Sequence, residues 1–464
     1  MSGTRDGAIG RAEKYFDDGG FLAELQRRVA IPTTSQEEGS MPALQQYVSG
    51  EMTDSLTKLG YECTVQPNPR AEYGPFLIAR RVEDPAKPTV LTYGHGDVIR
   101  GQEEQWREGL SPWKIVIEGD RMYGRGTADN KGQHTINIAA LACVLEERGS
   151  LGFNSTILIE TGEETGSPGL GDFCKANKAA LKADALIGSD GPRLDHRRPT
   201  IFGGTRGTLN FNLKLTMREG GHHSGNWGGL LANPGIIMAH ALACITDERG
   251  QIKVPEWRPK TLTNSIRAAL ADAVVDAGEG APEINEDWGE KSLTPVERVF
   301  GWNSFEVLAF KTGNPDRPVN AIPPSAIAYC QLRFVVGTDP HDIIPALKRH
   351  LAQHGFGQIE VEQARDVIMS ATRLDPENPW AKFASASIEK TSGQKPNMLP
   401  NLGGSLPNEV FTDILGLPTV WVPHSYAACS QHAPNEHLLA PVARDGLRLM
   451  TGLFWDLGAQ GRPS

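Results

Sequence analysis

Residues 89–97 read Thr-Val-Leu-Thr-Tyr-Gly-His-Gly-Asp, and this stretch predicts the fold class. Its first five residues form a short apolar run, typical of a buried strand, and the run ends in a Gly-His-Gly-Asp turn. Longer segments with helical spacing follow, at 136–148 and 168–178. Three further runs have the same form as the first: 155–160 (STILIE), 185–187 (ALI) and 419–422 (TVWV). This alternation predicts an α/β fold with a mostly parallel sheet flanked by helices.

An acidic residue, a histidine or both follow each of these four runs. In parallel sheets, ligands bind at the carboxyl ends of the strands. We therefore expect the four loops to converge on one rim of the sheet. The side chains concerned are, in chain order, His95 and Asp97, Glu163 and Glu164, Asp190, and His432.

The middle of the chain has a different pattern. Segments 208–216, 326–336 and 358–363 alternate apolar and polar residues, as half-exposed antiparallel strands do, and 233–244 and 342–354 have helical spacing. This pattern predicts a small α+β domain inserted in the α/β domain. We expect the catalytic domain to comprise residues 1–201 and 373–464, with the inserted domain at 202–372.

Composition excludes several functional classes. The chain has 464 residues, 39% of them hydrophobic and 22% charged, with a net charge of −10 and no basic stripe, which argues against nucleic-acid binding. No apolar stretch approaches the length of a membrane span, and the N-terminus lacks a secretory signal. The six cysteines are scattered, as reduced thiols usually are. These features predict a cytoplasmic enzyme or binding protein without membrane contact.

Each candidate residue has two interpretations when it is taken alone. His95 could bind a metal while Asp97 holds its other ring N–H, or it could be a hydrogen-bonded structural histidine. Asp129, in the glycine-rich segment 124–132 (GRGTADNKG), could point into a site or cap the next helix. The Glu163-Glu164 pair could supply a metal ligand and a base, or form an exposed acidic turn.

The candidates gain weight as a set. We expect all of them to lie at strand ends of one sheet. Two histidines and three carboxylates suit a pair of divalent metals bridged by one carboxylate, and such a pair activates water for hydrolysis. The His-Glu-x-x-His helix of single-zinc proteases does not occur in the chain.

At these motifs the sequence resembles the M20 family of metallopeptidases, which includes aminoacylases, carnosinase-type dipeptidases and glutamate carboxypeptidases. The resemblance covers nearly the whole chain. It implies a cis peptide bond after Asp129, and two metal ions, most simply zinc, with manganese or cobalt as alternatives. It further implies these roles: His95, Asp129, Glu164, Asp190 and His432 as metal ligands, Asp129 bridging; Asp97 as the acid that orients His95; and Glu163 as general base.

The inserted domain resembles the lid of this family. In the segment 220–234 (GGHHSGNWGGLLANP), His223 matches a histidine that reaches the neighbouring subunit's active site and stabilises the oxyanion. A homodimer through the lid is therefore expected. The resemblance also makes Arg333, Asn320, Gly404 and Ser405 candidates for substrate binding, with Arg333 facing a substrate carboxylate.

One departure affects the substrate. Dipeptidase-type relatives usually have an acidic residue before Gly-Gly-Ser, whereas Leu402 precedes Gly403 here. The prediction is a two-metal hydrolase that cleaves an amide bond in a short peptide or other small amino-acid derivative, of dipeptidase or carboxypeptidase type. An N-acyl-amino-acid deacylase is the alternative, and a metal-free binding protein on the same fold is a third reading.

Overall fold

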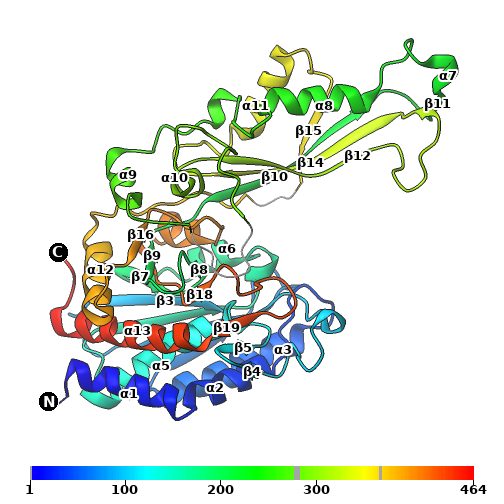
Figure 1. The fold of residues 1–464 in the computed structure, drawn as a ribbon. Helices are drawn as coiled ribbons and strands as arrows, with labels where there is room; N and C mark the ends of the chain where they lie inside the picture. The colour runs from blue at the N-terminus through cyan, green and yellow to red at the C-terminus, as the bar shows by residue number, and fades with distance from the viewer. Residues whose placement is uncertain (1–2, 276–282, 365–367) are drawn as a thin grey trace.

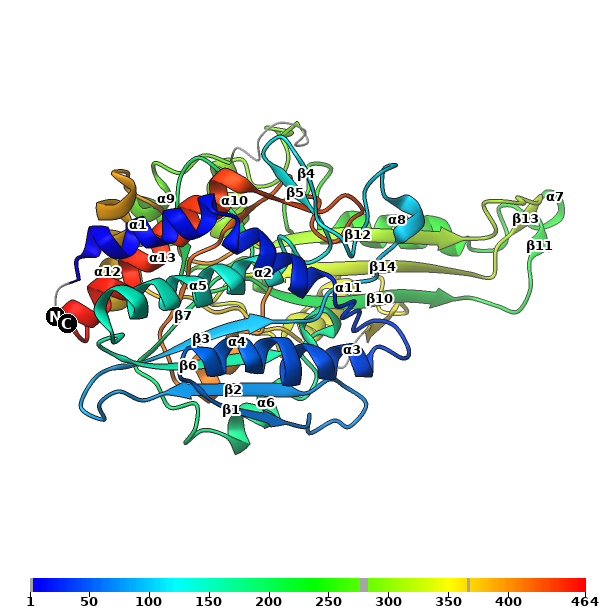
Figure 2. The same cartoon turned by 90° about the horizontal axis from the view of Figure 1, so that it is seen from below.

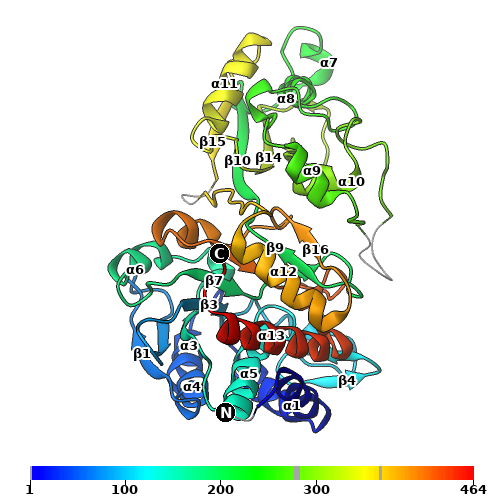
Figure 3. The ribbon, with the colours of Figure 1, turned by 90° about the vertical axis from the view of Figure 1, so that its left-hand side faces the viewer.

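The computed structural model describes residues 3–275, 283–364 and 368–464. The chain forms two lobes, one stacked on the other (Figures 1 and 3). The larger lobe contains both termini and an eight-stranded sheet, and the smaller lobe contains a four-stranded sheet. The predicted boundaries of the inserted domain remain a prediction.

The eight-stranded sheet is mixed, with a parallel centre. Its central strands β6, β3, β7 and β17 are all mutually parallel, and they are the four strands predicted from the apolar runs. Antiparallel pairs β1–β2, β2–β6 and β17–β9 flank this centre. In sheet order the strands are β1 (Glu62–Gln66), β2 (Phe76–Arg81), β6 (Asn154–Glu160), β3 (Thr89–His95), β7 (Ala185–Gly188), β17 (Thr419–Trp421), β9 (Thr200–Phe202) and β16 (Asn397–Leu399). The predicted α/β class is confirmed.

Helices cover both faces of this sheet. Successive residues of a strand point to opposite sides, so each central strand contributes apolar side chains to both cores. On β3, Val90 packs into one apolar core and Leu91 into the other. The first core is closed by α1 (Arg5–Asp17), α2 (Gly20–Val29), α4 (Thr53–Lys58), α5 (Lys131–Arg148), α12 (Pro379–Ser392) and α13 (Ala440–Gln460), several of which face the viewer in Figure 2. The second is closed by α6 (Leu170–Ala176) and by α9 (Asn264–Leu270) and α10 (Pro295–Phe300) from the middle of the chain. A short helix α3 (Met41–Gln46) precedes α4.

The smaller lobe is built on an antiparallel sheet, as the alternating pattern predicts. Its strand order is β12 (Ser304–Thr312), β14 (Ser325–Phe334), β10 (Gly207–Thr216) and β15 (Glu360–Gln363). Helices α8 (Pro234–Ile245) and α11 (Ile343–Gln353) pack on it and share one apolar core with it. Thr205 and Thr372 are hydrogen-bonded to each other, so the segments that enter and leave this lobe lie side by side.

Small elements complete the fold. A three-stranded sheet contains β4 (Val116–Glu118), β5 (Arg121–Tyr123) and β19 (His437–Leu439), and β8 (Pro192–Arg193) pairs with β18 (Ser425–Tyr426). At the far end of the smaller lobe, β11 (His222–His223) pairs with β13 (Ala321–Ile322), followed by α7 (Ser224–Trp227) (Figure 1). Within the described residues, no helix combines the length and apolar character needed to cross a membrane.

Candidate metal and active site

The loops at one end of the central strands carry most of the candidate residues. His95 is the last residue of β3, Glu163 and Glu164 lie three and four residues after the end of β6, and Asp190 lies two residues after β7. His432 lies in the long loop between β18 and β19, with a backbone φ of 59° that residues other than glycine seldom adopt.

Asp129 corrects one part of the sequence interpretation. It does not follow a strand of the large sheet but lies between β5, in the three-stranded sheet, and helix α5. It does not cap that helix either, because the N-cap position is Asn130 and no side chain caps it. The peptide bond between Asp129 and Asn130 is cis, as the family resemblance implies.

Two groups of potential metal ligands meet at Asp129. One group is His95, Asp129 and Asp190, in which His95 Nε2 lies 3.0 Å from Asp129 Oδ1 and 3.5 Å from Asp190 Oδ2. The other is Asp129, Glu164 and His432, in which His432 Nε2 lies 3.0 Å from both Asp129 Oδ2 and Glu164 Oε2. Asp129 thus presents one carboxylate oxygen to each group.

The donor set fits divalent cations. Asp190 Oδ2 is buried and has no hydrogen-bond partner, and a buried carboxylate oxygen is costly unless a positive charge neutralises it. Burial and the neighbouring Asp129 raise the pKa of Asp190 to about 6 and that of Glu164 to about 7. Hydrogen bonds that His432 donates to the Asp129 and Glu164 carboxylates raise the pKa of His432 to about 11. Carboxylates that hold a proton this tightly on an imidazole also attract a metal ion, which competes with that proton.

Asp97 contacts both sides of the site. Its backbone carbonyl accepts a hydrogen bond from His95 Nδ1 at 3.1 Å, while its carboxylate lies 3.5 Å from that nitrogen. The carboxylate accepts hydrogen bonds from the backbone N–H groups of Glu163 and Glu164 and from the Ser35 hydroxyl. Asp97 therefore fixes the His95 ring mainly through its carbonyl, and it fixes the Glu163-Glu164 turn through its side chain.

Glu436 supports the Asp129 loop and was assigned no role from the sequence. Its Oε1 accepts the backbone N–H groups of Gly126, Ala128 and Asp129 at 3.0, 3.0 and 3.1 Å. Its Oε2 accepts a hydrogen bond from Arg125 at 2.8 Å, and both of these side chains are buried. It lies four residues after His432, in the segment 431–437 (QHAPNEH), and this closeness in the chain was the available signal.

A cavity of 510 Å³ opens onto the metal-ligand groups from between the lobes. Asp129, Glu163, Asp190 and His432 form one side of it. Glu164 is not part of the wall but faces His432, so the two adjacent glutamates point to different places. Burial raises the pKa of Glu163 well above its usual range. The rest of the wall is largely apolar and contains Leu194, Val275, Val299, Phe300, Leu399, Leu402 and Leu406.

Three of the four predicted substrate-binding residues lie at this cavity. Arg333, Gly404 and Ser405 are in its wall, and Arg333 Nη1 donates to Ser405 Oγ at 3.2 Å. Asn320 is not among them. Its carbonyl accepts hydrogen bonds from Ser224 at the far tip of the smaller lobe.

His223 lies at this same tip. It is exposed, it pairs with Ala321 in the β11–β13 ribbon, and it is remote from the metal-ligand groups within the chain (Figure 1).

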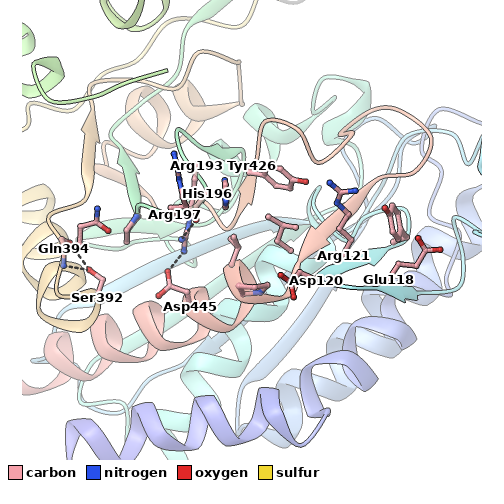
Figure 4. Close-up of a pocket in the computed structure, with 15 residues that line it drawn as sticks. Glu118, Asp120, Arg121, Arg193, His196, Arg197, Ser392, Gln394, Tyr426 and Asp445 are labelled. Atoms are coloured by element: carbon pink, nitrogen blue, oxygen red, sulfur yellow. Dashed lines mark hydrogen bonds and ion pairs between the residues drawn. The ribbon is translucent and has the colours of Figure 1, made fainter. Parts of the chain in front are cut away.

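A second cavity, of 770 Å³, lies beside the start of α13 (Figure 4). Its wall includes Arg121, Arg193, His196, Tyr426 and Asp445, and Arg193 is paired with Asp445 at 2.9 Å. Among the residues that the structure describes, its wall contains none of the predicted catalytic or metal-ligating residues. It is therefore not the candidate active site, although Arg193 also lines the 510 Å³ cavity.

Known proteins resemble this chain over nearly its whole length. The model of "Peptidase family M20/M25/M40" matches residues 91–456. The Beta-Ala-His dipeptidase of Rattus norvegicus is 25% identical, over 98% of this chain and 97% of its own length. The Cys-Gly metallodipeptidase DUG1 of Saccharomyces cerevisiae is 28% identical, over 90% of this chain and 91% of its own.

Solved structures give the same result. The M20 family metallo-carboxypeptidase Sso-CP2 from Sulfolobus solfataricus superposes with a TM-score of 0.77 at 25% identity, covering 95% of this chain and 99% of that one. Human carnosine dipeptidase 1 superposes with a TM-score of 0.75 at 21% identity, covering 98% and 100%, which shows a shared fold.

Proposed function

The chain belongs to the peptidase family M20/M25/M40 and is a metal-dependent peptidase, and from this premise we propose that it hydrolyses short peptides at a two-zinc centre. The observation that carries the proposal is the meeting of two ligand groups at Asp129, beside a cavity between the lobes and beside Glu163, which belongs to neither group. The relatives that it resembles include dipeptidases and a carboxypeptidase, which supports small peptides as the substrate class.

Five residues would hold the two metals. His95 and Asp190 would bind one, Glu164 and His432 the other, and Asp129 would bridge both. Nitrogen and carboxylate donors suit zinc, and the absence of a thiolate leaves manganese and cobalt as alternatives. When bound, such a pair supplies Lewis-acid polarisation of the substrate carbonyl and lowers the pKa of water by several units.

Glu163 would move the proton. It lines the cavity beside the ligand groups, whereas Glu164 turns towards His432. Asp97 holds the backbone of both glutamates in place. Glu163 would accept a proton from the attacking water and then deliver it to the departing amine, so that one carboxylate acts first as base and then as acid.

Arg333 would bind the substrate carboxylate. It projects from β14 into the cavity wall, where it donates to Ser405. Arginine pairs with carboxylates through two parallel N–H groups, and Gly404 leaves room for close approach to the backbone beside it. A cavity of 510 Å³ fits a dipeptide-sized molecule and not a folded protein.

Leu402 favours a second candidate, the deacylation of N-acyl amino acids. It lies in the cavity wall where an acidic residue would attract a substrate ammonium group, and several other apolar side chains surround it. An apolar wall of this kind suits an acyl chain or an apolar side chain better than a charged amine. The same hydrolytic groups would serve both substrates.

The smaller lobe would form a homodimer that brings His223 to the other subunit's site. Strand β12 is an edge of its sheet, and three of its apolar side chains, Val307, Leu308 and Phe310, are exposed. An exposed apolar edge strand is a ready surface for pairing with another chain. His223 and Asn320 lie together at the exposed tip, away from their own site, which supports a role across the interface.

The proposal is tested by Glu163→Gln in the zinc-loaded enzyme. The variant should lose activity by about 10³-fold, within the range of proton-transfer residues, and should keep the wild-type metal content. A panel of dipeptides and N-acyl amino acids, each assayed with and without a chelator, decides between the two substrate classes. Undiminished turnover by Glu163→Gln would remove Glu163 from the mechanism, and chelator-resistant turnover would remove the metals.

A further inference from the structure

Helices α8 and α11 bring three metal-binding side chains together in the smaller lobe. Cys244 lies near the end of α8, and His350 and His354 lie one turn apart at the end of α11. The thiol and one nitrogen from each imidazole all lie within 4.8 Å of one another. The two rings are 4.3 Å apart between centroids.

Both histidines are oriented by backbone carbonyls. His350 Nε2 lies 2.8 Å from the Cys244 carbonyl, and His354 Nδ1 lies 2.8 Å from the His350 carbonyl. A carbonyl oxygen can only accept a hydrogen bond, so each of these nitrogens carries the proton. The other nitrogen of each ring then has a free lone pair, which is the tautomeric arrangement found in metal-bound histidines.

The cluster has the access and spacing that a metal ion needs. His354 is exposed, whereas His350 is buried and Cys244 is half-buried, so the group opens to solvent on one side. Donor atoms around a tetrahedral zinc are roughly 3.5 Å apart, given its bond lengths of about 2.0–2.3 Å. Small side-chain rotations bring atoms that lie within 4.8 Å to this distance.

The donor types differ from those of the catalytic site. A thiolate with two imidazoles prefers zinc and other borderline or soft ions, whereas manganese and magnesium prefer oxygen donors. The cluster contains no carboxylate. It also lies in the other lobe from His95 and Asp190, on the helical layer formed by α8 and α11 (Figure 1).

We propose that Cys244, His350 and His354 form a zinc site that ties α8 to α11, with water as the fourth ligand. The site is independent of the catalytic centre. Zinc here crosslinks two helices that share one apolar core with the sheet, so it stabilises the lobe that forms one wall of the substrate cavity. Binding to the folded state alone raises the unfolding temperature.

The test is zinc content per chain, measured by native mass spectrometry on full-length protein stripped of metal and titrated with zinc chloride. His354→Ala, a change at an exposed side chain, should bind one zinc fewer than wild type, and Cys244→Ser should match it. His341→Ala, another exposed histidine beside the start of α11, and Cys63→Ser, another half-buried thiol, should bind as wild type does. Equal zinc content in wild type and His354→Ala overturns the proposal.

A second measurement requires no variant. Alkylation of Cys244 by iodoacetamide, followed by peptide mass spectrometry, should slow when zinc is added and should not slow with manganese. Unchanged labelling in zinc also overturns the proposal. Both tests measure zinc binding at Cys244, His350 and His354 alone. Failure of the proposed peptidase function would appear in a different measurement, as absence of metal-dependent peptidase activity.

Discussion

Replacing Glu436 by glutamine tests how the Asp129 loop is held. One oxygen of Glu436 accepts three backbone N–H groups, from Gly126, Ala128 and Asp129, and the other accepts from Arg125. In Glu436→Gln the amide oxygen can still accept the three N–H groups. The new NH₂ group then faces the Arg125 guanidinium, donor against donor, so Arg125 loses its buried counter-charge.

The expected cost follows from the burial of this pair. Both side chains are 1% exposed, and removing one partner of a buried ion pair costs about 3–5 kcal/mol. Arg125 keeps its hydrogen bond to the Ala433 carbonyl, so we expect the low end, about 3 kcal/mol, in the free energy of unfolding. Loosening the loop should also weaken metal binding by about 10–100-fold, the usual effect of losing a group that orients a ligand.

The assay is urea unfolding in a chelator at pH 8, followed by zinc competition against a chromophoric chelator. Glu409→Gln is the matched control. Burial raises the pKa of Glu409 to about 7, and its Oε2 has no hydrogen-bond partner. Burial also raises the pKa of Glu436, but a glutamine there leaves the buried Arg125 without its counter-charge, whereas a glutamine at position 409 removes no hydrogen bond to Oε2. A carboxyl whose pKa is raised by folding destabilises the protein above that pKa, so Glu409→Gln should not lower the stability at pH 8. Wild-type stability and zinc affinity in Glu436→Gln would refute the reasoning.

Other predictions concern the metals, the dimer and the substrate. Asp129→Ala should lose both catalytic metals and Glu164→Ala only one, as metal analysis in the His354→Ala background would show; equal losses would contradict a bridging Asp129. His223→Ala should reduce kcat by about 10²–10³-fold with metal content unchanged, and mixing it with Glu163→Gln should restore part of the activity if the tip crosses the dimer. Leu402→Glu should raise kcat/KM for dipeptides with a free amine over N-acyl amino acids by about tenfold; an unchanged ratio would remove Leu402 from the substrate contact.

The centre of the large sheet was predictable because its strands are buried on both faces. Continuous apolar runs such as 89–93 and 155–160 result from that burial, and they correspond to β3 and β6. The flanking strand β1 alternates half-buried and exposed residues. Strands β9 and β16 are no shorter than β17, but each contains only two consecutive apolar residues, against three at 420–422. Their pairing with neighbouring strands therefore defines them.

The site was predictable to the extent that strand ends carry it. His95 ends one buried strand and Asp190 lies two residues after another, and their convergence follows from the parallel sheet. Asp129 reaches the same place from a loop that no strand of that sheet positions. Three hydrogen bonds to Glu436, which lies 307 residues after Asp129 in the chain, fix that loop. No local pattern encodes a contact of this kind. The position of His223 relative to a second subunit is likewise not a property of one chain.

The central claim is that Asp129 bridges two metal ions. Anomalous diffraction from zinc-loaded crystals of the protein, recorded above and below the zinc edge, tests it directly. The account predicts two peaks about 3.5–4 Å apart, one beside His95 and Asp190 and the other beside Glu164 and His432, with Asp129 between them. A single peak in this site, or none, would contradict it.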